Sequence, residues 1–304
     1  MTLQDEMRAA CAAIGIIPPS SYREGRWTPC QVEGKARSNK SGRVIVNPGG
    51  ETGVAWNHVT GQHMRFSAAG VGGDAVAPRP RRDVAAERRQ QAEQAEVARI
   101  CERIVSAAEV APHAYLEAKG FPDERGLVLD DLRRHIPDHD LGRSVCRALP
   151  EGNGPWLIVP GRIGGRVTTL QFIGVDGLKK NIYRGRMAAA AHRISTGRET
   201  WVCEGIATAL TVRAALRLLG RSATVLSAFS AANVAKVASM IEGSIVAADH
   251  DRPLDQLHGK GTGEHYAAAS GRKWVMPPEE GDFNDWHQRD GLRAVAMRLR
   301  TVPP

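Results

Sequence analysis

Three acidic residues stand where the sequence passes from an apolar run to a turn or helix. Glu204 follows Trp201-Val-Cys203, and Asp249 and Asp251 follow the run 243–248. Side chains two residues apart in an extended segment point to the same side, so the two aspartates should lie close together. Carboxylates that close repel each other unless a cation neutralises them. The spacing therefore predicts a divalent metal site.

Magnesium is the expected metal, with manganese as a substitute. Mg²⁺ prefers hard oxygen ligands, keeps several waters and is usually held by a few carboxylates plus substrate phosphates, which suits phosphoryl transfer. An Asp-x-Asp after a strand is also typical of a helix N-cap, and this structural interpretation stays open. The Glu204-Gly205 pair at a second strand end favours the metal site.

The elements that must position these acids alternate between strand and helix patterns after Thr200. We predict strands at 201–203, 223–226, 243–248 and 273–276, with helices at 206–219, 231–241 and 263–269. Such alternation predicts an α/β fold with a parallel sheet covered by helices. In open parallel sheets, functional groups gather at the carboxyl ends of the strands, where all three acids fall.

The preceding region predicts a mixed α+β subdomain with a strongly basic surface. A helix at 112–120 ends in Gly120, and strands at 156–160, 167–173 and 178–183 form an antiparallel meander with a turn at 174–177. Between Pro160 and Arg198 a single acid, Asp176, stands against eight basic residues: Arg162, Arg166, Lys179, Lys180, Arg184, Arg186, Arg193 and Arg198. This surface should bind a single-stranded template and a triphosphate, with Tyr183 or Phe172 stacking on bases. Solvation of a hairpin is the alternative for some of these charges.

The first part of the chain is rich in Gly, Pro, Asn and Ser and predicts a small β-rich module. The stretch Ala77-Pro-Arg-Pro-Arg-Arg82 indicates a linker, and residues 83–110 predict a long solvated helix. We therefore divide the chain into a module at 1–75, a linker and helix at 76–110, a basic subdomain at 111–198 and a catalytic domain at 199–304.

The motifs resemble a known family. Val202-Cys-Glu-Gly-Ile-Ala-Thr-Ala-Leu210 with Ala247-Ala-Asp-His-Asp251 resembles the Toprim domain, which bacterial-type primases, type IA and type II topoisomerases and some nucleases share. The resemblance is closer to the Toprim primases of phages and mobile elements. It extends to His113-Ala-Tyr-Leu-Glu-Ala-Lys-Gly-Phe121, Leu157-Ile-Val-Pro160, Leu170-Gln-Phe-Ile173, Asp176-Gly-Leu-Lys-Lys180 and Gly281-Asp-Phe-Asn-Asp-Trp286. It covers roughly residues 110–290.

This resemblance implies a primase that makes short RNA primers. Metal ions would bridge the acids and a nucleoside triphosphate while a primer 3′-hydroxyl attacks the α-phosphate. Family roles imply that Glu204 lies nearest the nucleophile and that Asp249 and Asp251 are metal ligands. Asp282 and Asp285 would be additional ligands, although a turn and a helix N-cap explain them as well. The resemblance places Lys179, Lys180 and Arg184 toward the catalytic face.

The amino-terminal module has no Cys/His zinc ribbon, so we expect no zinc there. The segment 27–66 is similar to the zinc-free leading module of certain mobile-element primases. Its basic loop, with Lys35, Arg37 and Lys40, and its aromatic residues predict binding to single-stranded DNA. Burial of Trp27 and Trp56 in the core of a small β domain is the alternative.

Bulk properties agree with a nucleic-acid partner. The formal net charge is +8, which favours a polyanion because Lys and Arg release counterions from phosphates. Five widely spaced cysteines without a C-x-x-C pair are typical of reduced thiols. No signal-like segment opens the sequence, and no long apolar run occurs. We therefore expect a cytoplasmic protein that does not span a membrane. The resemblance to Toprim primases implies a monomer that works with a separate replicative helicase.

Two other functions remain open. A Toprim nuclease would use the same acids to direct water at a phosphodiester, although the basic subdomain favours a primase. The Gly259-Lys-Gly-Thr-Gly263 stretch lacks P-loop spacing, which argues against an ATP-driven nuclease or a fused helicase. A topoisomerase would require a nucleophilic tyrosine, and none of the four tyrosines has such a setting. A non-catalytic DNA-binding accessory protein of replication is the third possibility.

Overall fold

The computed structural model describes residues 2–68, 84–152 and 154–303 of the chain. It divides into two compact units, one formed by Met1–Arg82 with Arg252–Thr262 and the other by Asp83–Asp251 with Gly263–Pro304. The predicted linker at 77–82 lies outside the described residues, and the four-part division of the chain stays a prediction. Among the described residues, no helix has the length and apolar run that a bilayer crossing requires.

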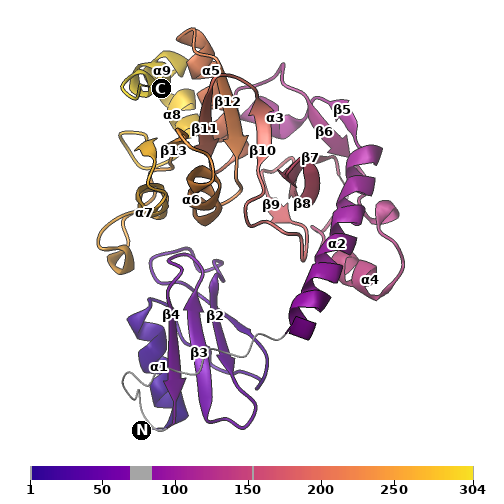
Figure 1. Ribbon diagram of the computed structural model, residues 1–304, viewed down its shortest axis with the longest axis vertical. Coiled ribbons are helices and arrows are strands. Elements are labelled where there is room, and N and C mark those ends of the chain that lie inside the picture. Colours follow the sequence, from indigo (N-terminus) through magenta and orange to yellow (C-terminus); the bar gives the residue numbers. More distant parts are fainter. Residues whose placement is uncertain (1, 69–83, 153, 304) are drawn as a thin grey trace. The chain divides into compact units, whose positions relative to one another are not determined.

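The first unit contains a helix and an antiparallel sheet (Figure 1). The sheet runs in the order β1 (Thr28–Cys30), β2 (Gly42–Val46), β3 (Thr52–Asn57) and β4 (His63–Ser67). Helix α1 (Leu3–Ala13), which we had not predicted, starts at a capping box in which Thr2 and Asp5 satisfy each other's backbone N–H groups. Its apolar face packs on one face of the sheet, so the unit is β-rich but not all-β.

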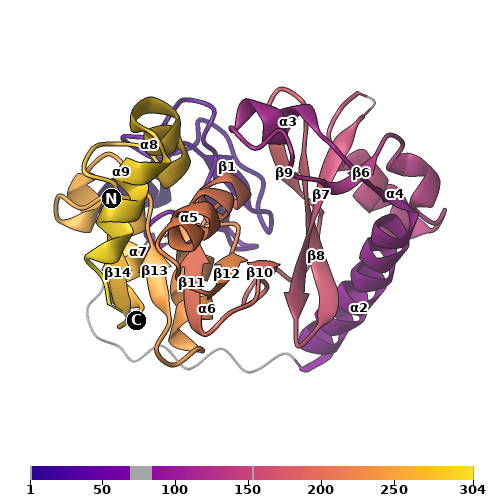
Figure 2. The same ribbon diagram turned by 90° about the horizontal axis from the view of Figure 1, so that it is seen from above.

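The second unit begins with helix α2 (Val84–Ala107), and the prediction of a fully solvated helix is wrong for one of its faces. Val97, Ile100 and Ile104 are completely buried against an antiparallel sheet. The sheet has the order β5 (Glu109–Ala111), β6 (Gly126–Leu129), β7 (Trp156–Ile163), β8 (Arg166–Ile173) and β9 (Lys179–Asn181), and Figure 2 shows α2 along it. The predicted meander is therefore present, with two further strands.

Short helices complete this part of the unit. They are α3 (Ala114–Ala118), the 3₁₀ turn η1 (Arg133–His135) and α4 (Asp140–Arg147). Gly120 follows α3 with φ +84°, a conformation that glycine adopts without strain, as the predicted helix end requires. Tyr115 and Leu116 of α3 pack under the sheet together with Leu157 of β7.

A second sheet follows in the order β10 (His192–Ser195), β12 (Ala223–Ser227), β11 (Glu199–Cys203), β13 (Ile245–Ala247) and β14 (Lys273–Val275). Strands β12, β11, β13 and β14 are parallel, as the sequence predicts, and β10 is an antiparallel edge strand. Neighbouring residues of β11 face opposite sides: Trp201 and Cys203 belong to one core cluster and Val202 to another. Both faces of this sheet are therefore buried.

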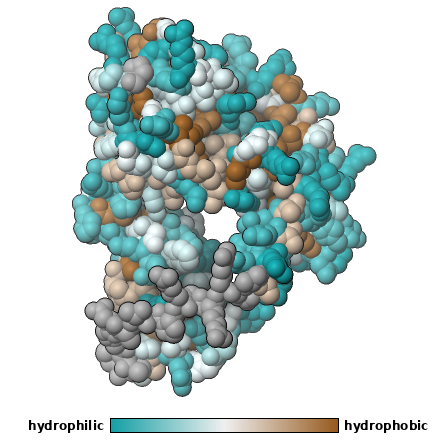
Figure 3. Space-filling model, in the orientation of Figure 1, coloured by the Kyte–Doolittle hydropathy of each residue, from teal (hydrophilic) through white to brown (hydrophobic). Residues whose placement is uncertain are grey.

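Helices cover the two faces of the parallel sheet. Helices α5 (Ile206–Leu218), α8 (Phe283–Asp290) and α9 (Leu292–Arg300) share the core of Trp201, whereas α6 (Ala231–Ser239) and α7 (Thr262–Ala269) share that of Val202. A 3₁₀ turn, η2 (Asp255–Leu257), precedes α7. Figure 3 shows a mostly hydrophilic surface with scattered apolar residues. The helix that follows each strand leaves the carboxyl edge of the sheet available to polar side chains.

Candidate active site

The carboxyl edge of the parallel sheet brings predicted site residues together. Strands β11 and β13 are parallel neighbours, with Cys203 opposite Ala247. Glu204 comes directly after the first strand, and Asp249 comes two residues after the second. The main chain at Glu204 is fixed by its own carbonyl, which accepts hydrogen bonds from Phe229 N at 2.8 Å and Ser227 Oγ at 3.0 Å. The two acids therefore project from adjacent strand ends.

Asp249 is the electrostatic centre of this edge. Burial raises the pKa of Asp249 well above its ordinary value, and the carboxylates of Glu204, Asp282 and Asp251 raise it further. Lys179 opposes this shift. The Oδ1 atom of Asp249 is enclosed and has no hydrogen-bond partner among the described residues. An enclosed carboxylate surrounded by like charges is costly unless a cation or proton compensates it.

The contacts of Asp251 also agree with the alternative that the Asp-x-Asp motif stabilises the start of a helix. Its Oδ2 accepts a hydrogen bond from Gly263 N, at 2.8 Å, in the first turn of α7. A side chain that satisfies a backbone N–H at a helix start contributes to helix stability. Asp251 thus fixes α7 and still acts on Asp249.

Asp282 and Asp285 form a helix cap, which was the structural alternative for both residues. The Oδ1 atom of Asp282 accepts hydrogen bonds from Asn284 N at 2.7 Å and Asp285 N at 2.8 Å, and Asp285 Oδ2 accepts one from Asp282 N at 3.3 Å. Both bonds to Asp282 use the same oxygen. Asp282 also raises the pKa of Asp249, whereas Asp285 lies 3.7 Å from Lys119 Nζ. Asp282 thus belongs to the acidic edge, and Asp285 serves the cap and an ion pair.

The donor set fits a magnesium-type ion held in part by water and substrate. Within residues 2–68, 84–152 and 154–303, no three His, Cys, Asp or Glu side chains form a ready-made metal-binding group. Mg²⁺ usually keeps several waters and takes only one or two carboxylates, so it does not need such a group. The enclosed oxygen of Asp249 is the observation that a bound cation would explain, as a proton on the carboxylate also would. Glu204 and Asp249, with Asp251 and Asp282 beside them, are the residues that would hold it.

Lys179 is the predicted basic residue that approaches the acids. It lowers the pKa of Asp249, and its Nζ would lie 3.7 Å from a Cβ placed on Gly205. The same Nζ lies 5.7 Å from the centre of the Tyr115 ring, which is within the range of a cation–π interaction. Lys179 therefore lies at the same edge of the sheet as the carboxylates.

The sequence placed Tyr115 in a helix and indicated no role for it in the site. Its ring is buried, and its hydroxyl is enclosed without a hydrogen-bond partner among the residues that the structure describes. Burial raises the pKa of Tyr115 to about 12, Lys119 opposes the shift, and Asp282 and Asp285 add to it. The tyrosine therefore lies beside the acidic edge. Its position depends on the packing of α3 under the sheet, which no local motif encodes.

Lys180 and Arg184, predicted on the same surface, contact other parts of the unit. Lys180 Nζ donates a hydrogen bond to Leu149 O at 3.0 Å, and Arg184 forms an ion pair with Glu93 of α2. Arg184 also lies 5.3 Å from the centre of the Tyr183 ring. Phe172 is completely buried, so the expectation that it stacks on bases is wrong, whereas Tyr183 is exposed.

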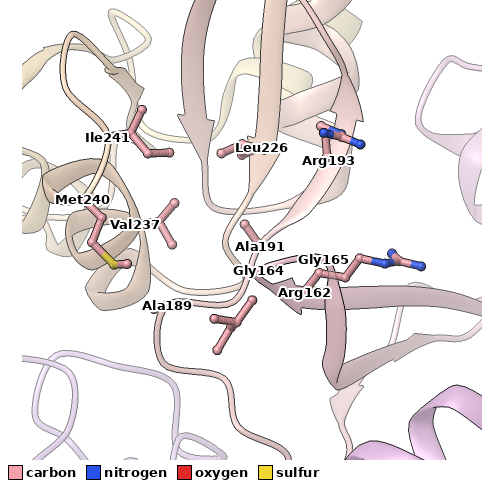
Figure 4. Close-up of a pocket in the computed structure, with 11 residues that line it drawn as sticks. Arg162, Gly164, Gly165, Ala189, Ala191, Arg193, Leu226, Val237, Met240 and Ile241 are labelled. Atoms are coloured by element: carbon pink, nitrogen blue, oxygen red, sulfur yellow. The ribbon is translucent and has the colours of Figure 1, made fainter.

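Arg162 lines a pocket of about 380 Å³ together with Arg193 (Figure 4). In this view Val237, Met240 and Ile241 lie on one side and the two arginine side chains on the other. None of the four acids of the edge is among the residues that line it. Arg162, predicted to bind nucleic acid, therefore lines a pocket whose walls include none of the predicted acids.

The predicted basic residues of the first unit lie between β1 and β2. Arg37 and Lys40 are exposed, and Lys35 is half-buried. They belong to a different compact unit from the acidic edge, so they form a separate candidate surface.

Asn284 is a site-supporting residue that the sequence did not indicate. Its Nδ2 donates hydrogen bonds to Lys119 O at 2.8 Å and to Thr211 Oγ1 at 3.1 Å. Gln288, one turn later, donates to Ala118 O at 2.6 Å. Helix α8 thereby satisfies carbonyls at the end of α3 and holds Asp282 near Tyr115. Such bonds join segments far apart in the sequence, so no spacing pattern predicts them.

The fold and the site define an α/β protein with an acidic carboxyl edge on a mainly parallel sheet. No family model matches the chain. It is similar to the primase fragment of the bacteriophage T7 primase-helicase, with 16% identity and a TM-score of 0.36 over 47% of this chain. It spans 62% of the length of that fragment.

Two bacterial structures are also similar. A DNA primase domain from Pseudomonas aeruginosa has 13% identity and a TM-score of 0.36, with 56% of this chain and 62% of that one covered. The Aquifex aeolicus primase, with its zinc-binding and RNA polymerase domains, has 11% identity and a TM-score of 0.39, with 99% and 85% covered.

Proposed function

We propose that the protein is a DNA primase of phage or plasmid type. It would make short RNA primers on single-stranded DNA by metal-dependent nucleotidyl transfer in a Toprim-type domain. The observation that carries the proposal is Asp249, whose enclosed oxygen lacks a hydrogen-bond partner among the described residues while Glu204, Asp251 and Asp282 act on it. Such an arrangement binds a divalent cation more readily than it tolerates its own charge.

The protein's residues would divide the work between holding and aligning the reactants. The chemistry that Mg²⁺ or Mn²⁺ would supply at these residues is a lower pKa of the attacking 3′-hydroxyl and neutralisation of charge on the phosphoryl oxygens. Glu204 would lie nearest the 3′-hydroxyl, and Asp249, Asp251 and Asp282 would hold the metal. Asp285 is the partner of Lys119 and would be an outer ligand.

Lys179 would bind the triphosphate opposite the carboxylates. Its ammonium would supply the positive charge that phosphate oxygens require, and it lies 5.7 Å from the centre of the Tyr115 ring, within the range of a cation–π interaction. The other basic residues of the region, including Arg162 and Arg193, would contact the template strand through its phosphates. We propose a monomer that works beside a separate replicative helicase in the cytoplasm.

The decisive experiment measures metal-dependent incorporation of labelled ribonucleotides on single-stranded DNA templates. Wild-type protein should extend primers with Mg²⁺ or Mn²⁺ and not with EDTA. Glu204→Gln and Asp249→Asn should remove the activity, because each removes a carboxylate from the edge. Metal-dependent cleavage of the template without synthesis would select the nuclease instead. DNA binding with neither activity would select the accessory protein.

A further inference from the structure

The sheet of the first unit has one open face. Side chains of β3 alternate between buried Ala55 and Asn57 and exposed Thr52 and Trp56. The buried set packs with α1, as the core cluster shared with Met7 shows. Trp56 stands on the opposite face, where it pairs in register with Arg43 of β2 and His63 of β4.

Three rings gather around Trp56, and we name Trp27, Trp56, His58 and His63 the aromatic cluster. The Trp56 ring stacks on His58 at 4.7 Å between centroids and lies 5.9 Å from His63. Trp27 meets it edge-on at 6.4 Å. Trp27 is 46% exposed and Trp56 38% exposed, so the alternative that both belong to the core of the unit is wrong.

Positive charge surrounds the aromatic cluster. Between Arg26 and Ser67 the sequence has two acids, Glu33 and Glu51, and six basic residues: Arg26, Lys35, Arg37, Lys40, Arg43 and Arg65. Arg43 lies next to Trp56 across the strands and is close enough to His58 to help lower its pKa, which burial lowers first. Arg65 points to the same side of β4 as His63, because the two are two residues apart.

We propose that the aromatic cluster is a platform on which unpaired bases of a single-stranded nucleic acid stack. Exposed, mutually ordered aromatic rings provide flat apolar surface that every base can cover, and nearby basic side chains neutralise the phosphates. Asn57, the amide residue next to Trp56 in the strand, is completely buried and donates to Ile14 O, so it does not read base edges. Binding should therefore tolerate any sequence. The inference does not depend on polymerase activity, since no residue of the acidic edge takes part.

The test uses the full chain, fluorescein-labelled dT20 and fluorescence anisotropy in EDTA. Trp56→Ala and Trp27→Ala should each weaken binding about tenfold, the loss expected when about 1–3 kcal/mol of base stacking is removed. Tyr22→Ala is the matched control, because Tyr22 is an aromatic residue of the same unit, 37% exposed and outside the cluster, and its loss should leave the affinity unchanged. Trp27 precedes β1, so its variant leaves the sheet core intact and keeps the test valid should Trp56→Ala unfold.

Two further probes, a DNA duplex and a single-stranded RNA, test which nucleic acid the aromatic cluster binds. A 20-base-pair duplex should bind without sensitivity to either Trp variant, because its bases are already stacked, and rU20 compared with dT20 tells whether RNA or DNA is preferred. Equal dT20 affinity of wild type, Trp27→Ala and Trp56→Ala would overturn the proposal. Primer synthesis is assayed separately: a chain that binds dT20 through Trp56 but makes no primer refutes the primase and leaves the platform in place.

Discussion

The acidic edge of the second unit and the aromatic cluster of the first are two candidate binding regions of opposite chemistry. The edge gathers like charges around a partly buried aspartate, whereas the cluster leaves large apolar rings in water. Both arrangements cost stability without a partner, the first through unfavourable electrostatics and the second through unburied apolar area. We propose a cation as the partner of the first and a single-stranded nucleic acid as the partner of the second. Because the two regions lie in different compact units, we expect a substitution in one to leave ligand binding by the other unchanged.

The largest expected effect follows from removing a carboxylate of the edge. Glu204→Gln or Asp249→Asn should lower primer synthesis by at least about 100-fold, since even outer partners of metal ligands are worth 10–100-fold. The affinity for dT20 in EDTA should stay within about twofold. Ribonucleotide incorporation and anisotropy measure the two effects. Full activity in either variant would contradict the role of the edge, and a parallel loss of dT20 affinity would contradict its independence from the cluster.

The adjacent lysines of β9 give a matched pair for the next effect. Lys179→Met should raise the KM for nucleoside triphosphates by about tenfold or more, because a hydrogen bond to a charged group is worth about 1.5–3 kcal/mol. Lys180→Met should leave it nearly unchanged, because Lys180 Nζ donates to Leu149 O instead. Steady-state kinetics of both variants decides the point. Equal effects of the two substitutions would remove Lys179 from the site.

Asp249 predicts a pH-dependent change in stability. Its pKa is raised in the folded chain, so the folded state binds the proton more tightly than the unfolded state, and stability falls as pH rises above the ordinary carboxyl range. Asp249→Asn removes this loss. In EDTA at neutral pH the variant should melt about 2–4 °C above wild type, as about 1 kcal/mol would give in a chain of this size.

The gain in melting temperature should disappear at about pH 3, where the aspartate is protonated in both states, and should shrink in Mg²⁺, which would compensate the wild-type charge. The exposed Asp123→Asn serves as the control and should follow wild type throughout. A variant that melts below wild type at neutral pH would show that the carboxylate is already compensated by the protein.

The smallest effect concerns the loop of the first unit. Arg37→Ala and Lys40→Ala should each weaken dT20 binding only slightly and reduce the slope of log affinity against log salt by about 0.7, the value for one phosphate contact on a single strand. Anisotropy at several salt concentrations measures the slope. An unchanged slope in both variants would show that Arg37 and Lys40 do not contact phosphates of the bound strand.

Local pattern was sufficient for most elements of the second unit. The strands before Glu204 and Asp249 and the helices after them were predicted because their apolar runs and glycine stops are local properties. Helix α1 was not predicted, because the Gly, Pro, Asn and Ser content of the whole first segment indicated a β-rich module and concealed its eleven helical residues. The prediction that α2 is solvated was wrong for one face of the helix. That face is buried because Ile100 packs on a sheet whose strand β8 lies about seventy residues later in the chain.

The sequence by itself determined that acids follow two strands, that a basic segment precedes them, and that aromatic and basic residues share the first module. Only the tertiary structure decided which of them meet: it placed Lys179 near Asp249 and turned Lys180 away, added Tyr115 beside Asp282, and left Trp56 exposed on an open sheet face. The physical reason is that residue type and spacing fix local backbone conformation, whereas side-chain encounters arise from the packing of segments distant in the chain.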